Sequence, residues 1–261
     1  MSETNEERSA RQAESKRAIT RDTYDAVLFD LDGVITDTAT IHATCWKQMF
    51  DAYLQQRAAE RGEPFRSFEI ATDYRRYVDG KPRVDGVRDF LTSRGIHLPE
   101  GTPEDPPQAD TVGGLGNRKN ALVNDVIAAV GVEPYAGTVA FVRQLRQQGV
   151  KVAVVTASQN CDAVLQAAKL EDLFEVRVDG NTVRAQHLAG KPAPDTYLMA
   201  AKLLGADPTR SVVVEDAISG VQAGRNGNFG CVIGVARQGN AEELRRHGAH
   251  LAVHDLGELV H

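Results

Sequence analysis

The chain has 261 residues, 42% of them hydrophobic, and a formal net charge of -6 at pH 7. This length allows one sizeable hydrophobic core, or a core domain with a smaller inserted domain. The acidic balance argues against general binding to nucleic acid or to anionic membrane surfaces. The longest apolar runs, such as residues 152–155, are far too short to cross a bilayer. We therefore expect a small-molecule partner.

The N-terminal segment, residues 1–22, is charged and polar, and we expect it to form a tail outside the core. It lacks the apolar central stretch of a secretory signal. The three cysteines, Cys45, Cys161 and Cys231, are widely spaced and follow no metal-binding pattern, which favours a reducing compartment. A cytoplasmic protein is expected, and nothing in the sequence requires more than a monomer.

A short buried strand is predicted at residues 26–29, because this mostly apolar run is bounded by polar residues. Asp30 and Asp32 follow it directly, at the carboxyl end of the strand. Two carboxylates at this spacing can divide the work of phosphoryl transfer. One attacks the phosphorus in line, and the other moves a proton at the oxygen on the far side. An acidic turn that closes the strand is the alternative interpretation.

The character of the chain changes between residues 38 and 132. An amphipathic helix is predicted from Ile41 to Leu54 and a second helical pattern from Ala121 to Ile127, joined by charged connections rich in Gly and Pro. Residues 98–116 are typical of an exposed loop, and buried strand-like runs are missing. We interpret residues 38–132 as an inserted, all-helical cap domain.

Alternating helix and strand signals resume after residue 132. Strands are predicted at residues 150–155, 176–178, 211–214 and 231–235, with helical patterns between them. This alternation predicts an α/β fold: a doubly wound parallel sheet with helices on both faces and a ligand site beyond the carboxyl ends of the strands. Residues 23–37 and 133–261 then form the core domain.

A second pair of carboxylates, Glu215 and Asp216, ends another buried strand. Placed beside Asp30 and Asp32, they offer the hard oxygen ligands that Mg²⁺ prefers. The alternative is a helix N-cap made by Asp216. Two acidic strand ends in one chain favour the metal site.

Two weaker motifs complete the set. Thr156, Ala157 and Ser158 follow the strand at 150–155, and hydroxyl and backbone N–H groups at a helix start can bind an anion. They could equally cap the helix. Lys191 is held between Gly190 and Pro192, although a solvated surface lysine is the usual fate of such a residue.

Taken in order, these motifs resemble those of the haloacid dehalogenase superfamily, from about Tyr24 to the C-terminus. The resemblance implies that Asp30 is a nucleophile that becomes transiently phosphorylated and that Asp32 is the general acid and base. It also implies a Rossmann-like core and a Mg²⁺ cofactor. The implied metal site comprises Asp30, the Asp32 carbonyl, Glu215 and Asp216. The implied phosphoryl-holding groups are Thr156 and Lys191.

The position of the insertion, directly after the first aspartate loop, makes the chain similar to the β-phosphoglucomutase-like subfamily, in its actinobacterial form. Members interconvert β-D-glucose 1-phosphate and glucose 6-phosphate through an aspartyl-phosphate and a glucose 1,6-bisphosphate. The resemblance implies further substrate-binding residues: His42, Trp46, Gly80, Arg83, Lys119, Ala157, Ser158 and Asn160. Arg83 matches the group that grips the phosphate that is not transferred, which favours a mutase over a phosphatase.

Two departures weaken that second grip. The subfamily has lysines at the positions of Asp79 and Gln159. We hypothesise that Lys81 replaces part of the lost charge. A sugar-phosphate phosphatase remains the alternative enzyme, and a catalytically silent binding module the alternative of another class. Each cap residue also has a structural interpretation: Trp46 and His42 as buried helix residues, Arg83 and Lys119 as solvated charges.

Overall fold

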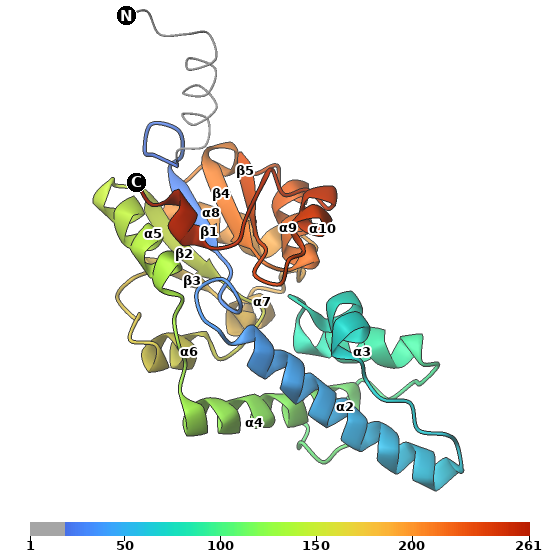
Figure 1. Ribbon diagram of the computed structural model, residues 1–261. Coiled ribbons are helices and arrows are strands. Elements are labelled where there is room, and N and C mark those ends of the chain that lie inside the picture. The colour runs from blue at the N-terminus through green and yellow to red at the C-terminus, as the bar shows by residue number, and fades with distance from the viewer. Residues whose placement is uncertain (1–18) are drawn as a thin grey trace, which may run out of the picture.

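A six-stranded sheet lies at the centre of this computed structural model, which describes residues 19–261 (Figure 1). Most of the expected tail, residues 1–18, lies outside the described residues. The strand order is β3-β2-β1-β4-β5-β6, and all neighbours are parallel. The strands are β1 (Ala26–Phe29), β2 (Lys151–Val155), β3 (Val176–Val178), β4 (Ser211–Glu215), β5 (Cys231–Val235) and β6 (Leu251–Val253). The predicted doubly wound α/β fold is confirmed.

Successive strand residues point to opposite faces of the sheet and build two hydrophobic cores. Val27 and Phe29 pack on one face, and Ala26 and Leu28 on the other, all fully buried. The first face is covered by α5 (Ala136–Gln147), α6 (Cys161–Ala167) and the 3-10 helix η3 (Leu256–Leu259). The second is covered by α8 (Asp195–Leu204), α9 (Ile218–Asn226) and α10 (Ala241–Arg246). Two short helices complete the core: α7 (Gly180–Ala185) and the 3-10 helix η2 (Pro208–Arg210).

The elements between β1 and α5 are all helical and lie below the sheet in Figure 1. We call them the cap helices: α2 (Ala39–Arg61), the π-helix η1 (Ile70–Val78), α3 (Arg83–Ser93) and α4 (Val112–Val130). They enclose a third hydrophobic core, in which the ring centroid of Phe50 lies 4.2 Å from that of Phe90 and 5.1 Å from that of Phe68. The domain limits at residues 38 and 132 stay a prediction.

The predicted loop at residues 98–116 is wrong in its last part, because α4 already begins at Val112. Residues 112–116 are buried rather than exposed. A Cβ atom on Gly113 would lie 2.4 Å from the Thr102 carbonyl oxygen, so only glycine allows the helix to pack this closely. Glycines disfavour helices in isolation, which is why the helix start was not visible in the sequence pattern.

Two cap helices occupy a stretch where the sequence indicated only charged connections. Helix α3 buries Val87, Phe90 and Leu91, whose spacing is that of a helical face. The π-helix η1 buries only Val78, and its charged residues, Asp73, Arg75 and Arg76, give it the composition of a connection. Strand β6 also was not predicted, since three residues are too few to show a period.

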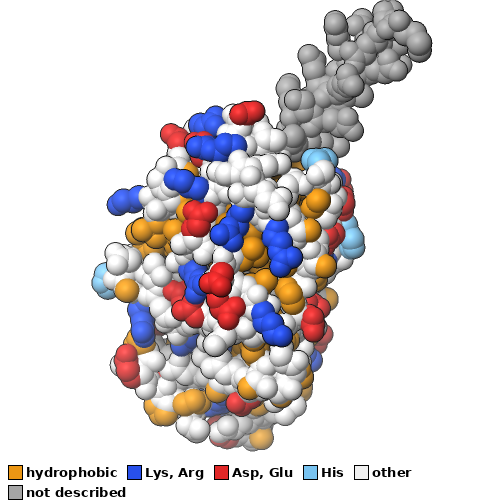
Figure 2. All heavy atoms as spheres, turned by 90° about the vertical axis from the view of Figure 1, so that its left-hand side faces the viewer, with side chains coloured by type: hydrophobic (Ala, Val, Ile, Leu, Met, Phe, Trp, Pro, Cys, Tyr) orange, Lys and Arg blue, Asp and Glu red, His pale blue; other side chains and the backbone are white. Residues whose placement is uncertain are grey.

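The surface carries charges of both signs. Figure 2 shows Lys and Arg side chains interspersed with Asp and Glu side chains over the left-hand face of Figure 1. Among residues 19–261, no helix combines the length and the apolar character that crossing a membrane would require.

The third core depends on Phe50, which is fully buried among aromatic rings. Replacing Phe50 with alanine is expected to lower the free energy of unfolding by about 3–5 kcal/mol, because it removes buried apolar surface and leaves a cavity. Urea denaturation measures this. Phe65→Ala is the matched control, since Phe65 is 42% exposed and should change stability by less than about 1 kcal/mol. Equal effects of the two changes would contradict the assignment.

Candidate active site

The two acidic strand ends lie side by side because β1 and β4 are neighbours in the sheet. The backbone N–H of Asp30 donates to the carbonyl of Val214 at 2.9 Å, which sets Asp30 next to Glu215. From β1 the chain adds β2 and β3 on one side of the sheet, and then β4, β5 and β6 on the other. In doubly wound folds, ligands bind at this topological switch point, beyond the carboxyl ends of the strands. Asp30, Glu215 and Asp216 each offer a carboxylate oxygen within 4.8 Å of the others.

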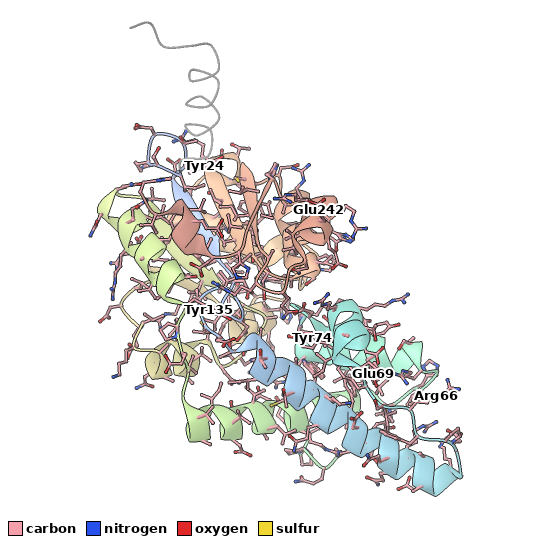
Figure 3. The ribbon with its side chains drawn as sticks, viewed as in Figure 1. Tyr24, Arg66, Glu69, Tyr74, Tyr135 and Glu242 are labelled. Atoms are coloured by element: carbon pink, nitrogen blue, oxygen red, sulfur yellow. The ribbon has the colours of Figure 1, made fainter. Side chains whose placement is uncertain are left out.

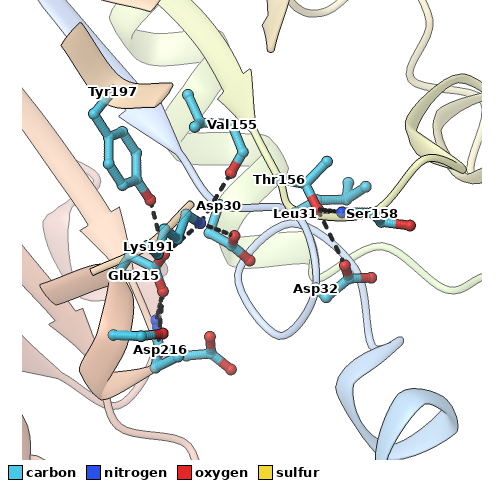
Figure 4. Close-up of polar contacts among 12 residues, drawn as sticks. Asp30, Leu31, Asp32, Val155, Thr156, Ser158, Lys191, Tyr197, Glu215 and Asp216 are labelled. Atoms are coloured by element: carbon cyan, nitrogen blue, oxygen red, sulfur yellow. Dashed lines mark hydrogen bonds and ion pairs between the residues drawn. The ribbon is translucent and has the colours of Figure 1, made fainter. Parts of the chain in front are cut away.

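Lys191 links these strand ends (Figure 4). Its Nζ lies 2.6 Å from Oδ1 of Asp30, 2.6 Å from Oε1 of Glu215 and 3.2 Å from the Val155 carbonyl. The residue is 3% exposed, so all three ammonium protons are used inside the protein. The alternative of a solvated surface lysine is therefore wrong.

Glu215 positions Lys191. Its Oε1 also accepts a hydrogen bond from the hydroxyl of Tyr197 at 2.8 Å, and its Oε2 accepts from the backbone N–H groups of Asp216 and Ala217, both at 3.1 Å. Glu215 is thus fixed by contacts on both carboxylate oxygens and has no exposed surface. Asp216 makes no comparable set of contacts, so its carboxylate is the freer of the two.

The acidic cluster holds more negative than positive charge. Burial raises the pKa of Asp30 well above its ordinary value, although Lys191 opposes this, and burial with nearby carboxylates also raises the pKa of Asp216. Burial acts to lower the pKa of Lys191, but Asp30 and Glu215 keep it above its ordinary value. A set of hard oxygen donors short of positive charge suits a divalent cation such as Mg²⁺, so the residues present fit the implied metal.

Asp32 points away from this cluster, toward the cap. Its carboxylate accepts a hydrogen bond from Thr38 and lies 3.4 Å from Oγ1 of Thr156 and 3.5 Å from Nε2 of His42. Thr156 in turn accepts from the backbone N–H of Ser158 at 3.0 Å. The Thr156 hydroxyl of the predicted anion loop therefore meets the second aspartate, as Figure 4 shows.

His42, Trp46 and Lys119 form the cap side of the site. Nζ of Lys119 lies 2.9 Å from Nδ1 of His42 and 5.1 Å above the Trp46 ring. Burial lowers the pKa of Lys119 to about 8 and that of His42 to about 4. Trp46 also stacks on Phe50, with centroids 5.2 Å apart, so it belongs both to the cap core and to the pocket wall.

One pocket collects most of the residues selected from the sequence. Those lining it are Asp30, Asp32, His42, Trp46, Gly80, Arg83, Lys119, Thr156, Ala157, Ser158 and Asp216. Lys191 and Glu215 lie behind this wall. Asn160 does not line it either, and its side chain donates to Asn120, which does, at 3.0 Å. Lys81 lines the pocket, but its ammonium pairs with Asp89 at 2.7 Å.

Tyr74, Val78 and Asp79, from the π-helix and the residue after it, also line the pocket, although none was selected as a site residue from the sequence. Tyr74 lies at the junction of cap and core (Figure 3). Asp79 follows the helix, and burial with the neighbouring Glu215 raises its pKa to about 7, against a hydrogen bond from Tyr74. The Asp79 carbonyl accepts from the Ser219 hydroxyl at 2.8 Å, which ties the cap loop to the core. The sequence indicates Asp79 only as a departure from a subfamily lysine, and it gives no signal for Tyr74.

The chain is similar to known proteins over most of its length. A family model described as haloacid dehalogenase-like hydrolase matches residues 24–228. The beta-phosphoglucomutase of Mycobacterium bovis is 51% identical over 238 residues, which cover 90% of this chain and 91% of that protein. A trehalose-phosphate phosphatase of Mycobacterium leprae is 39% identical over 147 residues, 55% of this chain and 32% of that protein. The crystal structure of beta-phosphoglucomutase from Clostridium difficile is similar in fold, with a TM-score of 0.71, 24% identity and coverage of 90% and 93%.

The buried cation of Lys119 is expected to make stability depend on pH. Because the folded-state pKa is about 8 and the ordinary value is 10.5, the unfolded chain holds the proton more tightly across this range. The free energy of unfolding of the wild type should therefore rise between these pH values by about 2–4 kcal/mol relative to that of Lys119→Met. Urea denaturation of both proteins at several pH values measures the difference, and parallel curves would contradict the burial of a charged Lys119.

Proposed function

The chain belongs to the haloacid dehalogenase superfamily, within its β-phosphoglucomutase-like subfamily, and is a phosphoryl-transfer enzyme; from this we propose that it interconverts β-D-glucose 1-phosphate and glucose 6-phosphate. The observation that carries the proposal is the arrangement of charge in the pocket. Asp30 and Asp32 line its core side, while Arg83 and Lys119 line it from the cap. A bisphosphate needs this arrangement, with one phosphate at the nucleophile and the other on a separate cationic group.

The proposed reaction has two halves. The Asp30 carboxylate attacks the phosphorus, so that an Asp30 oxygen–phosphorus bond forms while the bond from phosphorus to the sugar oxygen breaks. Asp32 gives its proton to the departing sugar oxygen. In the other half, which precedes it, Asp32 takes the proton from the 6-hydroxyl of β-D-glucose 1-phosphate as that oxygen attacks phosphorylated Asp30, so that the Asp30 oxygen–phosphorus bond breaks and glucose 1,6-bisphosphate forms. Glucose 1,6-bisphosphate is the intermediate that must turn round between the halves.

Mg²⁺ is the proposed cofactor. Asp30, Glu215, Asp216 and the carbonyl of Asp32 are its proposed ligands. Bound there, the ion would counter the negative charge of the transferring phosphoryl group. Lys191, already fixed by Glu215, would neutralise further charge on the same group. Thr156, which lines the pocket, would donate a hydrogen bond to it.

A sugar-phosphate phosphatase is the second candidate. It is favoured by the similarity to a trehalose-phosphate phosphatase and by the acidic and neutral residues, Asp79 and Gln159, that line the pocket in place of subfamily lysines. In that reaction water replaces the sugar hydroxyl as the group that attacks phosphorylated Asp30. The chemistry at Asp30 and Asp32 is otherwise the same.

The two candidates are separated by one assay. Purified protein is mixed with Mg²⁺, β-glucose 1-phosphate and a trace of glucose 1,6-bisphosphate, and the products are followed by phosphorus NMR. The mutase proposal predicts glucose 6-phosphate with little inorganic phosphate. Release of phosphate without isomerisation would reject the mutase and leave the phosphatase.

Replacing Asp30 with asparagine is expected to reduce phosphoryl transfer by about 10³-fold or more, because the amide is a poor nucleophile and a poor metal ligand. Asp37→Asn is the control: Asp37 lies in the same loop, is exposed, and accepts a hydrogen bond from Tyr135 at 2.8 Å, which the amide oxygen can still accept. Its activity should stay within about twofold of the wild type.

Removing divalent cations with a chelator should abolish activity, and added Mg²⁺ should restore it.

A further inference from the structure

A second cavity, of about 270 Å³, adjoins the active-site pocket. The two share Arg83, Ala157 and Gln159, whereas neither catalytic aspartate lines the second cavity. Its walls come from both sides of the molecule: residues 82–84 and 100–103 from the cap, and residues 180–184 from α7 of the core. A substrate held at Asp30 therefore has a built extension at this end of the pocket.

Arg83 is held in this wall by neutral groups. Its Nη2 donates to Oδ1 of Asn117 at 2.8 Å. The amide nitrogen of Asn117 donates in turn to the carbonyls of Pro103 and Asp105, at 2.9 and 2.8 Å. Within residues 19–261, no carboxylate pairs with Arg83. The guanidinium is thus fixed in direction while its charge is not neutralised.

Arg184 faces the same cavity from α7. This short helix is joined to the anion loop, because the N–H of Gly180 donates to the Ser158 carbonyl at 2.8 Å and the Asn181 amide donates to the Gln159 carbonyl at 3.0 Å. A Cβ atom on Gly180 would lie 2.7 Å from the Ala157 carbonyl oxygen, so the contact is close. The helix that carries Arg184 therefore packs directly on the loop that carries Thr156 and Ser158.

The guanidinium of Arg184 makes no hydrogen bond or ion pair in the part of the chain that the structure describes. Burial, and after it the nearby charge of Arg184, lower the pKa of Arg83. Glu100 is the acidic residue among the cavity walls, and both its oxygens are engaged by Arg88, at 2.9 and 2.8 Å. Two guanidinium groups thus share one cavity without a counter-ion, and each can bind a phosphate through paired N–H groups.

We propose that Arg184 is a specificity-determining residue that binds, together with Arg83, the phosphate of a sugar bisphosphate that is not being transferred. The chain has the neutral Gln159 where the subfamily has a lysine. Because α7 packs against Gln159, Arg184 supplies a positive charge close to that position. Lys81 is less suited to this role, because its ammonium is paired with Asp89. The inference rests on the proposed function in one respect, namely that the substrate carries a second phosphate.

The test compares two phosphoryl compounds. Hydrolysis of acetyl phosphate, a small donor with no second phosphate, is measured with Mg²⁺, and glucose 1,6-bisphosphate is added as a competitor. In Arg184→Ala the inhibition constant of the bisphosphate is expected to rise about 10- to 100-fold, the range for a lost charge-assisted hydrogen bond. The kcat/KM for acetyl phosphate should stay within about twofold. Arg184→Lys should restore part of the affinity.

Arg177→Ala is the matched control, because Arg177 lies on the neighbouring β3 but pairs with Asp162 at 2.6 Å and does not line the cavity. It should leave both constants unchanged. An unchanged inhibition constant in Arg184→Ala, no inhibition of the wild type, or an equal loss with both compounds would overturn the proposal. If the bisphosphate inhibits in a way that depends on Arg184 but the protein does not isomerise glucose phosphates, the mutase function is rejected and the role of Arg184 in binding the second phosphate is retained.

Discussion

The buried contact of Lys191 with Asp30 and Glu215 is the interaction on which the site depends. Parallel pairing of β1 and β4 forces their acidic ends together, and carboxylates this close repel one another and resist ionisation in a buried place. Lys191 offsets part of that cost, and its removal would leave buried charges without a partner. The remaining excess of negative charge is what makes the site fit a divalent cation, so the same interaction links the fold to the chemistry.

Charge is distributed unequally along the pocket. The acidic groups gather at the strand ends, whereas Lys119, Arg83 and Arg184 come from α4, α3 and α7 around the cap-facing end. Burying Lys119 beside a neutral His42 costs stability that an anionic substrate would return on binding. Under the proposed function, one phosphate would lie at the acidic end with Lys191 and the metal ion, and the other beside the cap cations. A sugar bisphosphate can bind in this way in either orientation.

The sequence was sufficient for the parts of the structure that depend on local pattern. Short buried strands followed by Asp30 and by Glu215 could be recognised, and parallel strands must bring their carboxyl ends to one edge. The parts that depend on packing between distant segments could not be predicted from the sequence. Helix α4 starts at glycines that only close contact with residues 102–109 explains, and Arg184 belongs to a six-residue helix whose position depends on the anion loop. Neither leaves a periodic signal.

The central claim is that Asp30 accepts the phosphoryl group. Its most direct test is to add Mg²⁺ and glucose 1,6-bisphosphate, quench with borohydride, which reduces an aspartyl-phosphate to homoserine, and map the modified peptide by mass spectrometry. We predict homoserine at position 30 in the wild type, and none when divalent cations are removed. Modification at Asp32 or Asp216 instead, or none at all during active turnover, would contradict the account.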